Sequence, residues 1–513
     1  MADTKREIER KYESDDSGLP DLTGVAGVAA VLDQGVAELD ATYYDTADER
    51  LAASSITLRR RTGGTDAGWH LKFPVATGVR DEIHAPLTDK LPSALGALVR
   101  SRVRDEELAP VVRLRSTRDI RHLVDVDGNL LAEVSVDAVR AERLSGGGRK
   151  AEWTEIEVEL ADGGDPAFLD KVDKRLRKAG VRPAESPSKL ARALAETGGK
   201  RQQPRKKDRA EPVTAGDHVL AYVRAQRDAI VELDPAVRRD VADSVHRMRV
   251  ATRRMRSTFK TYRKILDRTV TDPIGDELKW LAGELGAGRD QEVLAERIGA
   301  VVEELPPGLV TEPVRGRLRT WSKAWGGDSR RQIIDVLNGE RYLALLTSLD
   351  ALLADPPLRR AAAGKPATLL SKAVDEAYDV LAGLVEQALG TPPGRDRDVA
   401  IHEARKKAKR ARYAAEAAAP ALGKPASQLV ASMKDLQGLL GEHQDSVMSR
   451  EALRELAEQA HAAGENAFTY GLLYGREEQR AAAVEGELPG VWQAMKIPAG
   501  SRAYGQGSRP RYA

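Results

Sequence analysis

The sequence predicts an α+β domain built on an antiparallel sheet, followed by an all-α domain made of two similar helical bundles. Up to about residue 160, short segments alternate apolar and polar residues, which is typical of half-buried strands. From about residue 214 to 490 the chain is rich in Ala, Leu, Glu and Arg, a composition that favours helices. Two motifs recur within this second part at nearly the same spacing, which indicates a duplication.

The predicted strands share a period of two and are separated by breaks rich in Gly, Pro and Asp. They are 7–13, 56–61, 69–73, 111–115, 130–137 and 154–160. A helical segment from about 165 to 197 completes the first domain, which we place at 1–197. Residues 198–213 mix Gly, Pro and charge without apolar periodicity and predict a linker.

The second domain is placed at 214–497, with its two repeats at about 214–350 and 365–497. The last segment, 498–513, is predicted to be a disordered tail.

Composition excludes several classes of protein. The 513 residues include 81 basic and 79 acidic ones, so any basic function must be local. Aromatic residues make up 4% of the chain, which disfavours binding by base stacking. The absence of cysteine excludes disulfides and thiol catalysis. The charged N-terminus lacks a signal-peptide pattern and no run of about 18 apolar residues occurs, so we expect a cytoplasmic protein without a membrane partner.

A row of cations is predicted on one face of a helix near residues 245–263. Its members recur every three or four residues: His246, Arg249, Arg253, Arg256, Lys260 and Arg263. One residue earlier, Val245, Met248, Thr252, Met255, Phe259 and Tyr262 form a mostly apolar stripe in the same rhythm. A solvated surface face is the simpler alternative, but such faces usually interleave acids, and 246–263 contains none. The row therefore favours an extended partner with repeated negative charge.

The same row recurs 156 positions later as His402, Arg405, Lys409 and Arg412, and LGAGRD recurs as LGEHQD. This duplicated pattern resembles the CHAD domain (conserved histidine, alpha-helical) over about residues 214–490. The resemblance implies two helical bundles with a basic cavity that binds inorganic polyphosphate. The residues implied to bind it are His246, Arg249, Arg253, Arg256, Lys260, His402, Arg405, Lys409 and Arg412. The second copy departs from the first at Lys409 and Gln444, which replace arginines.

The predicted strands sort their charges by sign. Carboxylates share a face at Glu7 and Glu9, and again at Glu155, Glu157 and Glu159. Cations share faces in other strands: Arg59 with Arg61, Lys72 with His70, and Arg113 with Arg115. An ordinary sheet with one wet side is the alternative for any single strand. If the sheet closes into a barrel, these faces could line its interior, with glutamates for a divalent metal and cations for phosphates.

This arrangement resembles the CYTH family, the triphosphate tunnel metalloenzymes, over residues 1 to about 197. The ExExK signature stands as Glu7, Glu9 and Lys11; EIEVE contains Glu155, Glu157 and Glu159; the terminal SKL contains Lys189. The resemblance implies a closed β-tunnel and a metal-dependent hydrolysis of inorganic triphosphate to diphosphate and phosphate.

The resemblance also implies roles for individual residues. The triphosphate would be gripped by Arg59, Arg61, Lys72, Arg113, Arg115, Arg118 and Lys189. Mg2+ or Mn2+ would be held by Glu155 and Glu157, with Glu159 and Asp137 as further ligands. Glu7 and Glu9 would hold a second metal or position the attacking water, and Lys11 would bind substrate or act as an acid or base. Glu82 and Glu133 are further candidate acids of the inner face.

The leading hypothesis is therefore a triphosphatase joined to a polyphosphate-binding module, located in the cytoplasm with polyphosphate granules as a candidate location. Two alternatives remain: a non-catalytic polyphosphate-binding protein, and an adenylate cyclase-like enzyme acting on nucleotide triphosphates. Specific nucleic-acid binding is disfavoured by the few aromatics and by the near-zero net charge. The sequence leaves the oligomeric state open.

Overall fold

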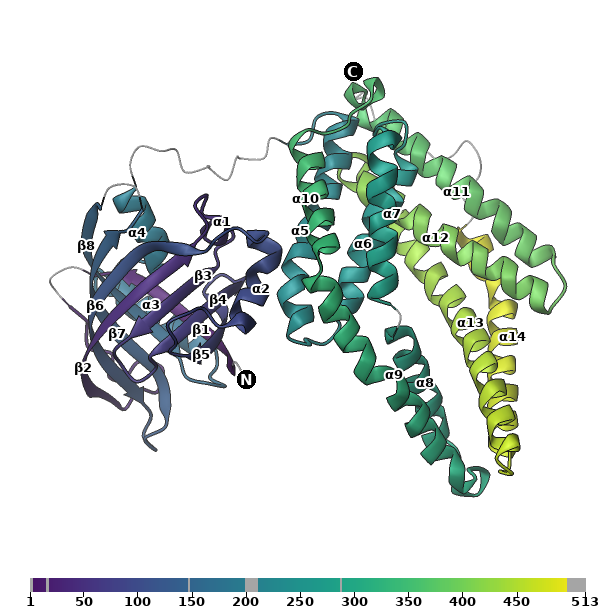
Figure 1. Ribbon diagram of the computed structural model, residues 1–513, viewed down its shortest axis with the longest axis horizontal. Coiled ribbons are helices and arrows are strands. Elements are labelled where there is room, and N and C mark those ends of the chain that lie inside the picture. The colour runs from purple at the N-terminus through teal and green to yellow at the C-terminus, as the bar shows by residue number, and fades with distance from the viewer. Residues whose placement is uncertain (1–2, 15–17, 146–147, 199–210, 287, 496–513) are drawn as a thin grey trace, which may run out of the picture. The chain divides into compact units, whose positions relative to one another are not determined.

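The computed structural model describes residues 3–14, 18–145, 148–198, 211–286 and 288–495. By its internal contacts the chain divides into two compact units, Met1–Asp208 and Arg209–Ala513, which the colours of Figure 1 distinguish. Most of the predicted linker, 199–210, and the predicted tail, 498–513, lie outside the described residues.

The first unit is a closed barrel of eight antiparallel strands, in the order β1-β5-β4-β3-β2-β6-β7-β8. The strands are β1 (Asp3–Glu13), β2 (Ala30–Asp45), β3 (Thr57–Thr62), β4 (Gly68–Ala76), β5 (Val79–Pro86), β6 (Ala109–Val124), β7 (Leu130–Arg143) and β8 (Lys150–Leu160). The predicted α+β class with an antiparallel sheet is confirmed. The sequence prediction did not name β2 or β5 as strands. A register shift between Asp33 and Val36 interrupts the alternation of β2, which explains why its pattern is weak.

The helices of this unit are α1 (Arg50–Ala53), α2 (Ser93–Val103), α3 (Ala167–Lys178) and α4 (Lys189–Thr197). The apolar face of α3 packs against Ile156 and Val158, and α2 packs against Trp69 and Leu71. These strand residues alternate with the charged ones, so the apolar side of the sheet there faces outward. The hydrophobic cores consequently lie outside this part of the barrel wall, which leaves the charged side facing inward.

At one end of the barrel, apolar side chains occupy the interior and form a hydrophobic core. Val112, Leu114 and Trp153 pack there against Leu190 and Leu194 of α4. This contact fixes the position of α4, whose first residue borders the barrel cavity.

The second unit is all-helical within its described residues, as predicted (Figure 1). Its helices are α5 (Ala215–Arg238), α6 (Ser244–Thr261), α7 (Arg268–Glu284), α8 (Arg289–Glu303), α9 (Glu312–Asn338), α10 (Glu340–Ala354), α11 (Pro366–Gly390), α12 (Arg395–Leu422), α13 (Lys424–Ala462) and α14 (Phe468–Met495), with short 3-10 turns at Pro307–Leu309 and Arg360–Ala363. One large core joins α5, α6 and α7 with α10, α11, α12 and α13. A second core joins the hairpin of α8 and α9 with α13 and α14. No helix in the described part of the chain is long and apolar enough to cross a bilayer.

The duplicated motifs occupy comparable helices. The two cation rows begin on α6 and α12, the motif LGAGRD lies at the junction of α7 and α8, and the motif LGEHQD lies within α13. The first copy breaks between α7 and α8, whereas α13 runs through the corresponding positions as one helix. The first motif carries Gly286 and Gly288 where the second has Gly441 and His443, and an additional glycine lowers helix stability at this point.

Candidate functional site

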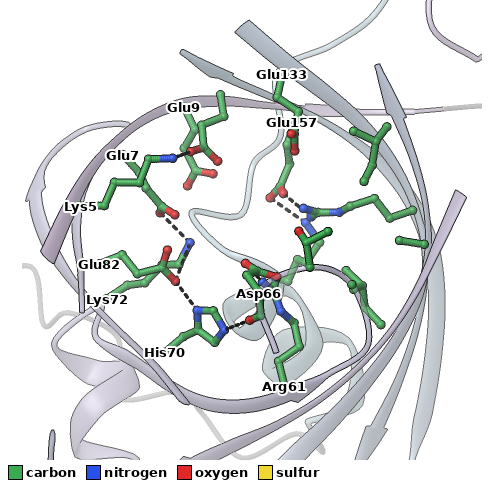
Figure 2. Close-up of a pocket in the computed structure, with 18 of the residues that line it drawn as sticks. Lys5, Glu7, Glu9, Arg61, Asp66, His70, Lys72, Glu82, Glu133 and Glu157 are labelled. Atoms are coloured by element: carbon green, nitrogen blue, oxygen red, sulfur yellow. Dashed lines mark hydrogen bonds and ion pairs between the residues drawn. The ribbon is translucent and has the colours of Figure 1, made fainter. Parts of the chain in front are cut away.

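The inner face of the barrel borders a cavity of about 630 Å3 that is lined mainly by charged side chains (Figure 2). The acids that line it are Glu7, Glu9, Glu82, Glu133, Glu157 and Glu159, with Asp66 and Asp162. The lysines and arginines that line it are Lys5, Lys11, Arg59, Arg61, Lys72, Arg80, Arg118 and Lys189. Most of the charged residues predicted for the barrel site therefore border one cavity, whereas Asp137 and Glu155 are buried and do not belong to its lining.

Strand alternation places these side chains. On β1, Ile8 and Tyr12 pack into the outer core, so Glu7, Glu9 and Lys11 point inward between and beside them. Burying a carboxylate in this way costs free energy unless a cation or hydrogen bond compensates. Lys11 supplies part of that compensation, since its Nζ lies 3.0 Å from Glu9 Oε2 and also contacts Glu157.

The SKL segment places a lysine among three buried acids. Ser188 caps α4 by accepting a hydrogen bond from the backbone N–H of Ala191, at 3.1 Å. Lys189 then follows, and its Nζ lies 3.0 Å from Asp137, 2.8 Å from Glu155 and 2.7 Å from Glu157.

These three acids fit a divalent cation. Each can offer a carboxylate oxygen, and the three ligand atoms lie within 4.8 Å of one another. An all-oxygen carboxylate set suits Mg2+ or Mn2+.

The lysine and arginine partners keep these acids charged. Burial opposes the ionisation of Asp137, but Lys189 and Arg118 outweigh it and lower the pKa of this carboxyl. Burial likewise opposes the ionisation of Glu157, and Lys11, Lys189 and Arg118 together hold its pKa well below the ordinary value. Both groups therefore present full negative charge at neutral pH.

A second group of acids lies on β1 and β5, visible in Figure 2. Lys72 Nζ lies 2.6 Å from Glu7 and 3.5 Å from Glu82, and the His70 Nδ1 lies 2.8 Å from Glu82. Burial raises the pKa of Glu7 to about 7, against the opposing charge of Lys72 and with the support of Glu82. Glu82 keeps a lowered pKa, because Lys72 and His70 outweigh its burial. Near neutral pH, Glu7 is therefore partly protonated while the neighbouring Glu82 is ionised.

The arginines that border the cavity are largely buried. Burial, and then the charges of Arg59 and Arg118, lower the pKa of Arg61 to about 9. Arg118 donates to Asp137 at 2.7 and 2.8 Å and to Glu157 at 3.0 Å. An anion that entered the cavity would relieve the repulsion among these cations.

Arg113 and Arg115 need a correction. They were predicted to grip the substrate, but they do not belong to the cavity lining. Arg113 and Arg115 alternate along β6 with the inward residues, and both lie beside Asp40, at 2.5 and 3.5 Å. Arg118 lies on the opposite face from them, which follows from the period of two.

Several cavity residues were not singled out by the sequence reasoning. The sequence predicts Glu82 only as a candidate acid, and it does not predict Arg80, Tyr43 or Asp66, which also line the cavity. The alternation of Arg80, Glu82 and His84 on β5 was the signal that could have identified this strand.

The apolar stripes predicted beside the two cation rows face the core of the helical unit. Met248, Met255 and Phe259 of α6, and Ala404 and Ala408 of α12, are buried in the shared core. Adjacent cations of the two helices lie near each other. Burial, and then the charges of Arg405, Arg253 and Arg412, lower the pKa of Lys409 to about 8.

Burial also lowers the pKa of His246; the charge of Asp243 opposes this shift, and the charges of Arg253, Arg249 and Lys409 support it. The cations of α6 and α12 therefore lie close enough together to create one region of positive electrostatic potential.

Some of these cations already have protein partners. Arg412 Nε lies 3.2 Å from Glu416, which Arg254 also contacts at 2.9 Å. The Nδ1 of His402 contacts Oε1 of Gln444. By contrast, the buried Nε atoms of Arg256 and Arg405 make no hydrogen bond within the part of the chain that the structure describes.

Comparison with known proteins agrees with this division. The CYTH domain family matches residues 5–194, and the CHAD domain family matches residues 221–454. The uncharacterized proteins MT2285 and Rv2226 of Mycobacterium tuberculosis are each 38% identical over 494 residues, covering 93% of this chain and 93% of the relative. Among solved structures, PptA from Streptomyces chartreusis matches with a TM-score of 0.47 and 22% identity, covering 55% of this chain and 99% of that one.

The order of the two domains and the length of the match to the relatives both indicate which family the chain belongs to. CYTH tunnel enzymes use divalent metals, and the tunnel of this chain carries a carboxylate group that fits one. The chain belongs to the family of proteins in which a CYTH domain, the triphosphate tunnel fold, is followed by a CHAD domain.

Proposed function

We propose that the barrel hydrolyses inorganic triphosphate to diphosphate and phosphate with Mg2+ or Mn2+, and that the helical unit binds inorganic polyphosphate. The observation that carries the proposal is the barrel interior, where buried cations and grouped carboxylates border one cavity. Catalysis of phosphoryl transfer rests mainly on positioning and on neutralising charge, which is what such a lining supplies.

The composition of the lining favours a bare phosphate chain over a nucleotide. A nucleoside would need apolar or stacking contacts for its base. The aromatic side chains of the cavity lining are Tyr43, His70 and His84. His70 is held by Glu82 and by the backbone carbonyl of Asp66, at 2.8 and 2.9 Å, so it is already committed to the protein.

The divalent metal would be held by Asp137, Glu155 and Glu157, with Glu159 beside them on the same face of β8. When bound, it would neutralise phosphate oxygens and make the phosphorus a better electrophile. Lys189 neutralises the same acids in the structure described here and would turn toward a phosphate oxygen. Glu9, ionised and beside Lys11, would serve as a ligand of a second cation or orient the water.

The remaining residues have roles in holding the substrate and moving a proton. Arg59, Arg61, Lys72 and Arg118 would bind the phosphoryl oxygens. The oxygen of a water molecule attacks the terminal phosphorus, the bond to the bridging oxygen breaks, and diphosphate leaves with that electron pair. Glu7, with a pKa of about 7, can accept the proton that the water loses.

For the helical unit, the proposal rests on the cations of α6 and α12. The charges of Arg253 and Lys409 contribute to the lowered pKa of His246, and the charge of Arg253 contributes to that of Lys409, so these cations lie within electrostatic reach across the two repeats. The buried Nε of Arg256 and of Arg405 offer donors to an anion. A polyanion with a charge on every unit would match such rows better than an isolated phosphate.

The activity is tested by measuring phosphate release from triphosphate, ATP and long-chain polyphosphate, with Mg2+, with Mn2+ and with chelator. We expect metal-dependent release from triphosphate, and a loss of at least about a hundredfold in kcat/KM for Glu7→Ala/Glu9→Ala. Glu152→Ala is the matched control, because Glu152 lies on β8 with its side chain exposed. Faster cleavage of ATP would overturn the substrate assignment, and no release from any of the three would leave a binding protein only.

Binding by the helical unit is tested separately with long-chain polyphosphate at several salt concentrations. Arg249→Ala/Arg253→Ala is expected to weaken binding at least tenfold and to reduce its salt dependence. Arg247→Ala is the control. It removes one positive charge from an exposed position of α6 that does not belong to the cation row, and it should weaken binding less than either substitution in the row. Equal affinity for duplex DNA of similar charge would contradict a preference for polyphosphate.

A further inference from the structure

A second group of ligating side chains lies within the helical unit. Asp398 on α12, His443 on α13 and Glu485 on α14 each offer one ligand atom, and these atoms lie within 4.8 Å of one another. We propose that this group, the 398/443/485 triad, is a binding site for a divalent transition-metal ion. The site is separate from the barrel and does not depend on the proposed hydrolysis.

The distances in the triad suit a shared cation. The Nε2 of His443 lies 3.3 Å from Oδ1 of Asp398 and 3.3 Å from Oε1 of Glu485. Both separations are longer than the usual 2.9–3.0 Å of an N–H···O hydrogen bond, and one ring nitrogen carries at most one proton. Ligand atoms bonded to a common ion at roughly 2.0–2.2 Å are separated by about 3 to 3.5 Å. The two equal distances are in the range expected of ligands that share one ion, and the ligand atoms of Asp398 and Glu485 lie within 4.8 Å of each other.

Two arginines hold the carboxylates in this orientation. Arg450 donates to the second oxygen of Asp398, Oδ2, at 3.1 Å, and Arg397 donates to the second oxygen of Glu485, Oε2, at 2.8 Å. Each carboxylate thus keeps its other oxygen directed at His443. Such outer contacts orient metal ligands in known sites and reduce the entropy lost on binding.

Burial and chemistry narrow the class of metal. The side chain of His443 is 1% exposed, whereas Asp398 and Glu485 are 18% and 14% exposed. The imidazole is thus fixed inside the bundle, and the carboxylate side retains access to solvent for further water ligands. One nitrogen and two carboxylate oxygens suit Zn2+, Co2+ or Mn2+ better than Mg2+, which prefers oxygen ligands alone.

The triad belongs to the second repeat only. At the spacing of the glycine-containing motifs, 155 positions, His443 corresponds to Gly288 in the first repeat. The site is therefore not one of the duplicated features that form the cation rows. Its ligands come from three helices, so an ion there would link α12, α13 and α14. The neighbouring residue Gln444 contacts His402, so the linked helices include the one that carries the second cation row.

The test uses the full-length chain, freed of metal with a chelator and then titrated with Co2+ alone. Wild type is expected to bind one more equivalent of Co2+ than His443→Gln or Glu485→Gln, with a visible absorption band that both variants lose. Zn2+ should displace this equivalent, and a tenfold excess of Mg2+ should not. Glu487→Gln and His461→Gln are matched controls, because they change exposed residues of α14 and α13 and should keep the band.

The result that would overturn the proposal is an equal number of Co2+ equivalents and the same absorption in wild type, His443→Gln and Glu485→Gln. Displacement of the ion by Mg2+ would equally contradict it, since that outcome would assign the ion to the barrel carboxylates. If loss of the buried imidazole unfolds the bundle, Glu485→Gln decides alone. It keeps the size of the side chain, and its fold is checked by circular dichroism.

Discussion

Glu7 is a single carboxyl whose properties come from its burial and from two neighbours, Lys72 and Glu82. It is 5% exposed, it lies 2.6 Å from Lys72, and it faces Glu82. Burial and Glu82 favour the protonated acid, while Lys72 favours the carboxylate, and the pKa settles at about 7. Such a group is present in both forms near neutral pH, which is the requirement for accepting a proton during turnover.

Glu7→Gln should lose activity and yet stabilise the barrel above neutral pH. The ordinary pKa of a glutamate is 4.5 and that of folded Glu7 is about 7, so the folded state binds this proton more tightly. The destabilisation due to Glu7 therefore develops as the pH rises from about 4.5 to 7 and is complete above 7. The free energy of unfolding of the variant should exceed that of wild type by about 1–3 kcal/mol at pH 8 and by much less at pH 4.

Thermal or urea unfolding of the first unit at the two pH values measures this difference, with the exposed Glu152→Gln as control. A variant less stable than wild type at pH 8 would show that the Lys72 ion pair outweighs the burial of Glu7.

At the scale of an element, strand β6 shows how alternation assigns function. Arg118 and Ile120 border the cavity, whereas Arg113 and Arg115 lie beside Asp40 on the other face. The three arginines are close in sequence, and they differ in position only because successive residues of a strand point to opposite faces of the sheet.

Arg118→Ala and Arg113→Ala are therefore expected to differ. The first should lower kcat/KM for triphosphate by about a hundredfold, because it removes a cation from the cavity and leaves Asp137 with one fewer partner. Arg113→Ala should stay within about threefold of wild type, since exposed ion pairs contribute little. Steady-state kinetics with triphosphate measures both, and equal losses would contradict the assignment of the two faces.

The duplicated glycines of the helical unit form a second matched pair. A Cβ at Gly286 would lie 2.4 Å from Nη2 of Arg249, too close to be accommodated without a shift of the guanidinium. At Gly441, the equivalent position, the nearest atom is Nη2 of Arg405 at 3.6 Å, an ordinary contact. Gly286 thus leaves space for a member of the first cation row.

Gly286→Ala should weaken polyphosphate binding several-fold by displacing Arg249, while Gly441→Ala should leave it within about twofold. Because the displaced atoms are at the end of a flexible side chain, the stability of either variant should change by less than about 1 kcal/mol. Binding titrations and thermal unfolding of the two variants check this. Equal affinities would show that the position of Arg249 does not matter.

On the scale of the whole molecule, each unit has hydrophobic cores of its own. Among the described residues, the barrel unit has three, and the helical unit has two that join its helices. Separate cores allow each unit to unfold independently.

Calorimetry of the full chain should therefore show two transitions, which the fragments 1–208 and 209–513 assign. Diphosphate with Mg2+, the proposed product, which is not consumed, should raise the Tm of the first by about 5 °C or more at a hundred times its Kd, and long polyphosphate should raise the second. A single transition that responds to both ligands would contradict independent units.

The local patterns predicted a good part of this architecture. The period of two in TEIEVEL and the helical spacing of His246, Arg249 and Arg253 placed side chains on faces that the structure confirms for Glu157 and for the buried Met248 and Met255. Strand β2 was missed because its bulge disrupts the alternation on which such a prediction depends. Arg113 and Arg115 share a face, as predicted, but that face lies beside Asp40 and outside the cavity lining, because the inward side of β6 is the one that carries Arg118.

The sequence by itself determined which residues carry charge, which faces they share, and that the helical half is duplicated, because periodicity is a local property of the chain. Only the tertiary structure decided that the barrel closes, that Lys189 lies among Asp137, Glu155 and Glu157, and that His443 meets Asp398 and Glu485. These groups join residues far apart in the sequence. Their distances depend on strand register and helix packing, which no local pattern records.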